Sequence, residues 1–221
     1  PPLLPHPPPP QNTPRPWSSA ASDVYKRQGL IRPIGQFVIK NALLHLHAMD
    51  NQSDTRYSLT INLSPRQLQD ETFVEFLRNQ LVYFSIDPGR IILEITENSL
   101  MENNIRNEKK LEEIREVGCL IAIDDFGTGF SSLSYLRRFA VDILKIDQAF
   151  IQRVPNDEAD SKLIRGIINM SRELGIAVIA EGVEKKSQYD FLVENGCDMA
   201  QGFYFSKPVK AELIHENMVN L

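Results

Sequence analysis

The sequence predicts an α/β protein with a parallel sheet, because strand-like and helix-like segments alternate along most of the chain. Six apolar runs rich in branched residues each lead into a helical pattern. Polar residues in successive runs are 32, 30, 21, 36 and 20 residues apart, about the length of one strand, one helix and two short loops. The run 120–123 is apolar at every position, which is typical of a strand covered on both faces.

The six predicted strands end at, or carry, polar residues. In chain order the strands cover residues 58–63, 91–96, 120–125, 142–147, 177–182 and 198–202. Their polar residues are Asn62, Glu94, Asp124 with Asp125, Lys145, Glu181 and Gln201. Because the carboxyl ends of parallel strands meet at one edge, we expect these side chains to converge where (β/α) barrels and open parallel sheets place their sites.

The helices between the strands have readable ends. Ser64 followed by Pro65 predicts an N-cap with proline at the first helical position. Helical patterns over 102–117, 158–174 and 185–195 are each followed by glycine, which is typical of a helix C-terminus. An Asp-Pro-Gly turn at 87–89 leads into the strand at 91.

Composition predicts one globular domain. The chain has 221 residues, of which 42% are hydrophobic and 24% are charged. A net charge of −5 without a Lys/Arg cluster argues against a dedicated DNA or RNA surface, although a nucleotide with few phosphates stays open as a ligand. We expect no membrane span in this chain, since no apolar stretch reaches about 18 residues. Cys119 and Cys197 begin strand-like runs, so we expect buried thiols in a reducing, cytoplasmic compartment.

Residues 1–28 differ from the rest of the chain. This segment is rich in proline and has no apolar periodicity, so we expect it to be disordered or polyproline-like. It lacks the basic start and apolar centre of a signal peptide. Residues 23–28 look like a translated sequencing adapter. We therefore expect 1–28 to be non-native, with a natural proline-rich ligand segment as the alternative, and 29–221 to be the domain.

The polar residues at the strand ends have the chemistry of hard metal ligands. Asn62, Glu94, Asp124 and Asp125 offer oxygen atoms, which suit Mg²⁺ or Mn²⁺ better than zinc. At the end of a strand the backbone turns, so both adjacent aspartates can face one pocket and one can bridge two cations. Taken alone, an Asp-Asp pair is also typical of a helix cap or a solvated turn.

Six short motifs occur in order after the predicted strands. They are Asn62-Leu63-Ser64, Glu94-Ile95-Thr96-Glu97, Asp124-Asp125-Phe126-Gly127-Thr128-Gly129, Leu144-Lys145-Ile146-Asp147, Ala180-Glu181-Gly182-Val183-Glu184 and Gln201-Gly202-Phe203. Together they resemble the EAL domain, the bacterial cyclic di-GMP phosphodiesterase, from about residue 29 to 221. The resemblance implies a TIM-like (β/α)₈ barrel that hydrolyses cyclic di-GMP to linear 5'-pGpG with two Mg²⁺ or Mn²⁺ ions.

The resemblance also implies metal ligands. Asn62 and Glu94 would bind the first ion, Asp124 would bridge both ions, and Asp125 with Glu181 would bind the second. These residue types agree with the oxygen chemistry that Mg²⁺ and Mn²⁺ prefer.

Four further residues take roles from the resemblance. Lys145 would hold or activate the attacking water, acting as a base only if burial and metals lower its pKa. Asp147 would orient Lys145, Glu184 would brace the loop 125–132, and Gln201 would position water or substrate. Taken without the family, Lys145 and Asp147 read as a salt bridge at the rim, and Glu184 and Gln201 as solvated loop residues.

One departure from the family is large. The Glu-Ala-Leu tripeptide that names the family, with its metal-binding glutamate, is absent. Residues 29–221 supply six βα units, short of the eight strands of a closed barrel. We therefore expect the barrel to be incomplete at the N-terminus, with unpaired strand edges beside the gap, and we expect little or no hydrolysis by this chain alone.

Two functions stay open. The parent protein is a cyclic di-GMP phosphodiesterase, or it carries a degenerate EAL domain that acts as a cyclic di-GMP receptor or a protein-interaction module. The retained candidate ligands favour the enzyme. An upstream sensor or diguanylate cyclase domain, a membrane anchor outside this chain and a homodimer formed near the Asp125 loop are all left open. Phe203 and Phe205 are candidates for stacking on guanine, although core packing is the favoured interpretation.

Overall fold

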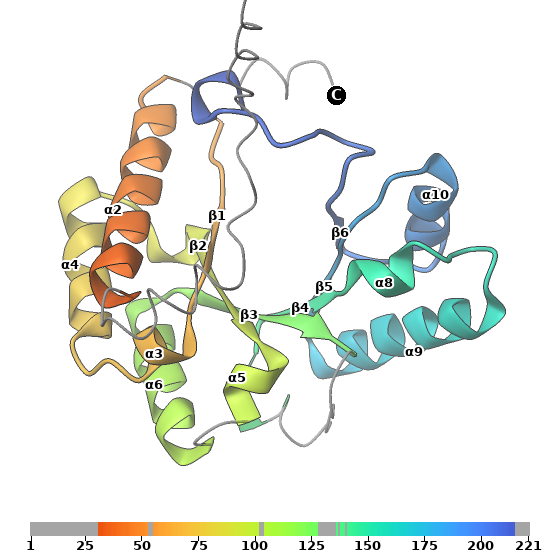
Figure 1. Cartoon of the computed structure of the whole chain (residues 1–221), viewed down its shortest axis with the longest axis horizontal. Coiled ribbons are helices and arrows are strands. Elements are labelled where there is room, and N and C mark those ends of the chain that lie inside the picture. Colours follow the sequence, from red (N-terminus) through yellow and green to blue (C-terminus); the bar gives the residue numbers. More distant parts are fainter. Residues whose placement is uncertain are drawn as a thin grey trace, which may run out of the picture.

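The computed structural model describes residues 31–52, 55–101, 104–127, 136, 138–139 and 141–214. Within these residues, six strands form one sheet in the order β1-β2-β3-β4-β5-β6, and every neighbouring pair is parallel. The strands are β1 (Leu59–Asn62), β2 (Ile91–Thr96), β3 (Leu120–Phe126), β4 (Ile143–Ile146), β5 (Ala177–Ala180) and β6 (Met199–Ala200). The sheet curves with its helices on the outside, as part of a barrel (Figure 1). The predicted strands and the incomplete TIM-like barrel are confirmed.

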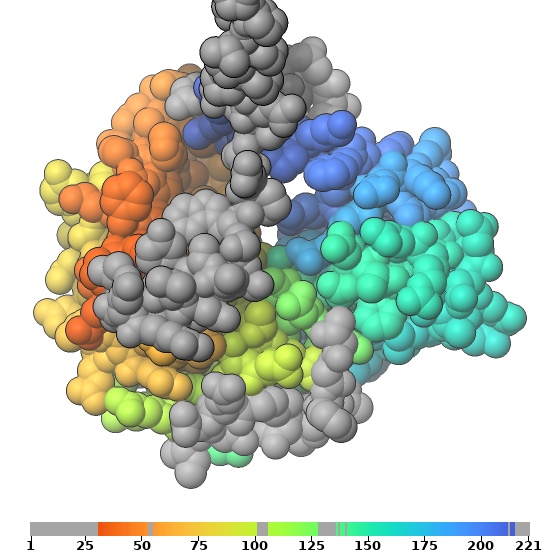
Figure 2. All heavy atoms as spheres, in the orientation of Figure 1, coloured from red at the N-terminus to blue at the C-terminus, as the bar shows by residue number. Residues whose placement is uncertain are grey.

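Longer helices cover the outer face of the curved sheet, and helices of four or five residues follow the ends of strands. They are α2 (Ile31–Asp50), α3 (Pro65–Leu68), α4 (Phe73–Phe84), α5 (Glu97–Met101), α6 (Asn104–Val117), α8 (Gln148–Ile151), α9 (Glu158–Leu174) and α10 (Lys186–Glu194), with 3₁₀ turns η1 (Pro88–Arg90) and η2 (Ala211–Leu213). Figure 2 shows the orange and yellow flank of α2 and α4 and the teal flank of α8 and α9 on opposite sides of the green strands.

The predicted helix ends have clear physical causes. The Ser64 hydroxyl accepts a hydrogen bond from the backbone N–H of Gln67, and Pro65 occupies the first turn of α3. Helix α9 occupies the predicted range and ends at Gly175, whose φ of 70° is left-handed. Helix α6 ends before Gly118, with a φ of 102°. The start predicted for α6 at residue 102 lies outside the described residues.

The sheet has two different apolar faces. A large outer core packs the strands against the helices and includes Ile61, Leu93, Ile121 and Leu144. A small inner cluster, formed by Ile92, Ala122, Ile143 and Ile179, fills the concave face. Because side chains alternate between the faces, both sets of positions must be apolar, which explains the continuous runs in the sequence.

The two cysteines are free thiols, as expected. Cys119 is buried, and burial raises its pKa to about 12. Cys197 is only partly buried, and desolvation raises its pKa to about 11. No helix in the described part of the chain has both the length and the apolar character needed to cross a bilayer.

Candidate active site

The carboxyl ends of the strands present charged side chains on the concave face. Each of four charged residues lies two positions after a member of the inner apolar cluster, so strand alternation directs both to the same face. The four pairs are Ile92 with Glu94, Ala122 with Asp124, Ile143 with Lys145, and Ile179 with Glu181. The charged residues therefore form a layer directly above the inner cluster.

Lys145 is the centre of this layer. Its side chain on β4 is 5% exposed, and its ammonium contacts the carboxylates of Glu94, Asp124 and Glu181. The Nζ atom lies 3.2 Å from Asp124 Oδ1 and 2.5 Å from Glu181 Oε1. Burial alone lowers the pKa of Lys145, but hydrogen bonds to Glu181 and Glu94 outweigh burial and raise it. Lys145 is therefore an ammonium ion in this arrangement.

The carboxylates around Lys145 have the donor chemistry of a divalent-cation site. Three carboxylates share one ammonium, so the group carries a formal charge of −2. Burial raises the pKa of Glu181, and the neighbouring Asp124 and Glu94 raise it further, while Lys145 lowers it. Within the described residues no group of three His, Cys, Asp or Glu side chains is arranged to hold a metal as it stands. The oxygen-rich, negatively charged cluster nevertheless fits a hard cation such as Mg²⁺ or Mn²⁺.

A β-bulge places Asp125 in the site. Ile123 pairs with Leu144 and Phe126 pairs with Ile146, so β3 has one residue more than β4 between these pairs. Asp125 lies in this interval and has a left-handed φ of 58°. The irregularity overrides strict alternation, and Asp125 lines the same pocket as Glu181.

The environment of Asp125 is acidic. Desolvation raises its pKa, and the negative charges of Asp124 and Asp147 raise it further, whereas Lys145 lowers it. The two aspartates 124 and 125 lie within β3 itself. This placement brings both carboxylates to the functional edge instead of forming the helix cap or solvated turn that the pair alone also allowed.

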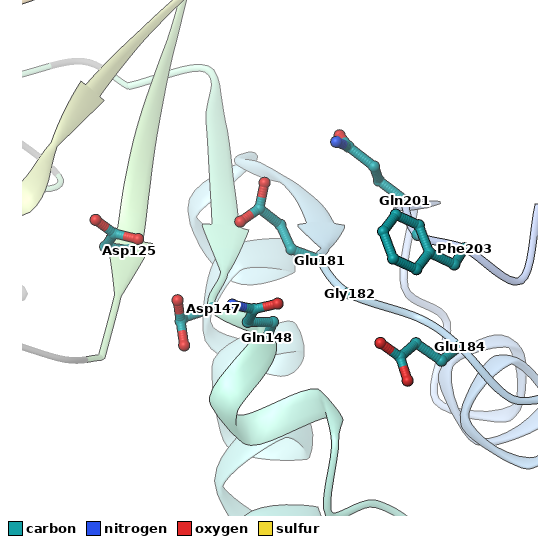
Figure 3. Close-up of a pocket in the computed structure, with 9 residues that line it drawn as sticks. Asp125, Asp147, Gln148, Glu181, Gly182, Glu184, Gln201 and Phe203 are labelled. Atoms are coloured by element: carbon teal, nitrogen blue, oxygen red, sulfur yellow. The ribbon is translucent and has the colours of Figure 1, made fainter. Parts of the chain in front are cut away.

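A pocket of about 310 Å³ opens beside the Lys145 cluster (Figure 3). Its lining residues come from β3, α8 and the segments after β5 and β6: Asp125, Asp147, Gln148, Glu181, Gly182, Glu184, Gln201, Gly202 and Phe203. Asp147 is also the N-cap of α8, since its Oδ1 accepts a hydrogen bond from the N–H of Ala149 at 2.7 Å. The structure thus brings Asp125, Asp147, Glu181, Glu184 and Gln201 to one cavity.

Asn62 is next to the ion-paired cluster but takes no part in the ion pairs of Lys145. It is the exposed last residue of β1, and its Cα is in register with that of Glu94 on β2. Most of the loop that Glu184 was predicted to brace, residues 128–132, lies outside the described residues. The role predicted for Glu184 therefore stays a prediction, although its side chain does line the pocket.

Two polar residues directly after strands, one of them in the pocket, had no predicted role. Gln148 is the first residue of α8 and lines the pocket between Asp147 and Gly182 (Figure 3). Helix α8 has four residues, too few to show helical periodicity, and only the Asp147 cap signals it. Glu97 is buried at the first residue of α5, directly after β2. The sequence feature that could have identified Glu97 is its position as a charged residue immediately after a buried strand.

The two phenylalanines after β6 have different environments. Phe205 packs against the outer core, and its ring centroid lies 5.7 Å from that of Tyr189. Core packing is therefore confirmed for Phe205. Phe203 is 58% exposed and lines the pocket, so core packing was wrong for Phe203.

Fold and site together define a protein with an incomplete (β/α) barrel and an acidic edge at the carboxyl ends of its strands. The model of the EAL domain family matches residues 18–208. The chain therefore belongs to the EAL domain family.

Named relatives of the chain act on cyclic di-GMP. The bifunctional diguanylate cyclase/cyclic di-GMP phosphodiesterase MucR of Pseudomonas aeruginosa is 36% identical over 85% of this chain and 27% of its own length. A solved structure of the MucR phosphodiesterase with cyclic di-GMP has a TM-score of 0.82 and 35% identity, covering 87% of this chain and 78% of that chain. BlrP1 of Klebsiella pneumoniae, solved with calcium and cyclic di-GMP, has a TM-score of 0.74 and 28% identity, covering 86% of this chain and 46% of that chain.

Proposed function

We propose that the protein to which this chain belongs hydrolyses cyclic di-GMP to linear 5'-pGpG by a two-metal mechanism. The observation that carries this proposal is the group of Glu94, Asp124 and Glu181 around Lys145 at the carboxyl ends of the strands of an EAL domain. The chain spans about a quarter of the length of curated relatives such as MucR. The activity of the whole protein is therefore part of the proposal.

The metal ligands are proposed from the side chains present. Asn62, Glu94, Asp124, Asp125 and Glu181 would hold two Mg²⁺ or Mn²⁺ ions, with Asp124 shared between them. Bound there, the ions would offset the charge of the phosphodiester and lower the pKa of a bound water. The net charge of −2 around Lys145 supports this assignment, because in the metal-free protein the single ammonium leaves part of the negative charge uncompensated.

Lys145 is proposed to act as a fixed cation. Its raised pKa makes it a poor general base while Glu94 and Glu181 hold its ammonium. As an ammonium ion it donates hydrogen bonds and attracts a water or phosphate oxygen in the pocket. Base catalysis by Lys145 would require these carboxylates to turn toward metal ions, which removes the hydrogen bonds that raise its pKa.

The other pocket residues are proposed to bind substrate. Gln201 offers an amide that can donate to a phosphate or hold a water, and Asp147 stays in place as the cap of α8. Phe203 presents an exposed aromatic face beside Gln201, on which a guanine base can stack. Four acidic side chains line this pocket, so we expect a doubly charged cyclic dinucleotide to bind weakly unless cations are present.

The experiment is hydrolysis of cyclic di-GMP with Mg²⁺ or Mn²⁺ by the longest native form of the protein. Glu94→Ala and Lys145→Ala are expected to lose 5'-pGpG formation, while Asp198→Ala, a substitution at the opposite end of the sheet, retains it. The 221-residue chain run beside them tests the expectation that it shows little or no hydrolysis. A folded, longer protein that binds the nucleotide and leaves it intact would make this domain a receptor.

A further inference from the structure

One buried side chain joins two separate walls of the pocket. Gln188, in the first turn of α10, is 2% exposed, although its side chain is polar. Its Oε1 accepts hydrogen bonds from the backbone N–H groups of Glu184 at 2.8 Å and Lys185 at 2.9 Å. Its Nε2 donates to the backbone carbonyl of Ile151 at 3.1 Å. A single amide therefore connects the segment before α10 to the end of α8.

Both connected segments carry pocket residues. Helix α8 begins with Gln148 and follows Asp147, while the segment 181–185 carries Glu181 and Glu184. The two segments also touch directly at Gly182, where an added Cβ would lie 2.5 Å from Gln148 Cβ. This close approach needs both the small residue and its left-handed φ of 68°.

The segment 181–185 is held on its other side as well. The N–H of Val183 donates to the carbonyl of Gln201 at 3.0 Å, and the N–H of Tyr204 donates to the carbonyl of Val183 at 2.9 Å. An added Cβ at Gly202 would lie 2.1 Å from the carbonyl oxygen of Val183. Backbone contacts thus fix the segment against the loop after β6, and Gln188 fixes it against α8.

Helix capping explains only two of the three hydrogen bonds of the Gln188 side chain. Hydrogen bonds to Glu184 and Lys185 satisfy orphan N–H groups at the start of α10, as many capping residues do. Capping does not require the third bond, which reaches a carbonyl 37 residues earlier in the chain. A buried amide with both ends paired in this way stabilises one relative placement of the two segments.

We propose that Gln188 is a positioning residue for the reaction: it holds α8 against the segment 181–185 and so sets the spacing between Asp147 and Gln148 on one wall and Glu181 and Glu184 on the other. Gln188 does not line the pocket, so it acts through these residues. The proposal rests on the proposed phosphodiesterase activity for its kinetic effect.

Two variants separate the two halves of the contact. Gln188→Leu removes all three hydrogen bonds at similar volume. Gln188→Glu keeps an oxygen to accept from Glu184 and Lys185 but removes the amide donor to Ile151. The matched control is Asn195→Ala at the other end of α10, where Nδ2 donates to Phe191 O at 2.6 Å, away from the pocket.

The kinetic measurement uses the longest native form with cyclic di-GMP and Mg²⁺. We expect kcat to fall about ten-fold or more in Gln188→Leu, because a small misplacement of reacting groups has large rate effects. The kcat of Gln188→Glu should lie between that of Gln188→Leu and that of the unsubstituted protein. The kcat of Asn195→Ala should equal that of the unsubstituted protein.

Hydrogen exchange distinguishes the proposed role from simple capping, because the loss of a helix cap on α10 alone would not change the exchange rates in α8. Gln188→Glu should keep the protection of the Glu184 and Lys185 amides and accelerate exchange in residues 148–152. If Gln188→Leu does not fold, the kcat and the hydrogen exchange of Gln188→Glu test the proposal. Unchanged exchange rates in α8 together with an unchanged kcat would contradict the proposal and would show that Gln188 acts only as a helix cap. If the unsubstituted protein binds cyclic di-GMP without hydrolysis, the proposed function has failed, and affinity replaces kcat as the measure for Gln188.

Discussion

Carboxylates at the two ends of the same sheet have opposite surroundings. At the amino end, Asp142 Oδ2 accepts from the N–H of Ile121 at 2.9 Å, and Asp198 Oδ2 accepts from the N–H of Val178 at 2.8 Å. At the carboxyl end, Glu94, Asp124 and Glu181 share Lys145. The first group satisfies donors of the neighbouring strand, while the second concentrates negative charge around one cation.

The pKa shifts at the two ends differ in sign. Asp50, near the amino end, accepts two hydrogen bonds from Arg90 at 2.6 and 2.8 Å, and this pairing lowers its pKa. Desolvation and neighbouring acids raise the pKa of Asp125 and Glu181 at the carboxyl end. Arg90 therefore favours the ionised form of Asp50 in the folded state, whereas the surroundings of Asp125 and Glu181 disfavour theirs, as is typical of functional sites.

The largest expected effect comes from a substitution at the carboxyl end of the sheet. Glu181→Gln should reduce hydrolysis of cyclic di-GMP about 100-fold or more, since it removes a proposed metal ligand. The free energy of unfolding without metal should change by less than about 1 kcal/mol, because the amide relieves repulsion with Asp124 and Glu94 while weakening the bond to Lys145. Steady-state kinetics and urea unfolding measure the two quantities.

A metal titration controls this experiment. Mg²⁺ should raise the melting temperature of the unsubstituted protein, because a ligand that binds only the folded state stabilises it. The rise should be smaller in Glu181→Gln. Equal activity in both proteins would exclude Glu181 from the reaction.

The next largest effect is expected from a substitution near the amino end of the sheet. Asp50→Ala leaves Arg90, whose side chain is 15% exposed, without its carboxylate partner, and should lower the free energy of unfolding by about 2 kcal/mol. Hydrolysis per folded molecule should stay unchanged, because Asp50 lies at the end of α2 and does not line the pocket. Chemical unfolding and kinetics at a temperature where the variant is folded test both statements.

The sequence was sufficient for the strands and for the charged residues that gather at their carboxyl ends. The continuous apolar runs reflect the inner and outer clusters, and residues 91–96 are a strand as predicted. The residues at the strand ends also predicted which charges would meet, since parallel strands align their carboxyl ends.

The sequence alone could not predict details that depend on strand register or on contacts between residues far apart in the chain. The bulge that turns Asp125 into the pocket depends on how β3 pairs with β4. The convergence of the strand ends was predicted, but the pairing of one ammonium, that of Lys145, with three carboxylates depends on side-chain positions that the sequence alone does not give. The link from Gln188 to Ile151 spans 37 residues and has no local signature.

A smaller effect comes from the strand-edge carboxylates. Asp198→Ala leaves the N–H of Val178 without its side-chain acceptor and should cost about 1–2 kcal/mol of stability. Asp198→Asn retains an oxygen acceptor and should recover most of the loss. Thermal unfolding of the three proteins measures this series, and equal losses in both variants would show that charge, and not the hydrogen bond, matters at the amino end.

The smallest effect is a pH dependence that separates the two ends. Arg90 lowers the pKa of Asp50 below its usual 3.8, so this pair stabilises the fold fully above that value and loses its contribution as the pH falls toward the lowered pKa. The free energy of unfolding should therefore fall more steeply below about pH 4 in the unsubstituted protein than in Arg90→Gln, where the pair is already absent. Urea unfolding from pH 6 to pH 3 gives both slopes. Parallel curves for the two proteins would mean that Asp50 is not held ionised by Arg90, and the contrast in pKa between the two ends would then rest on the carboxyl end alone.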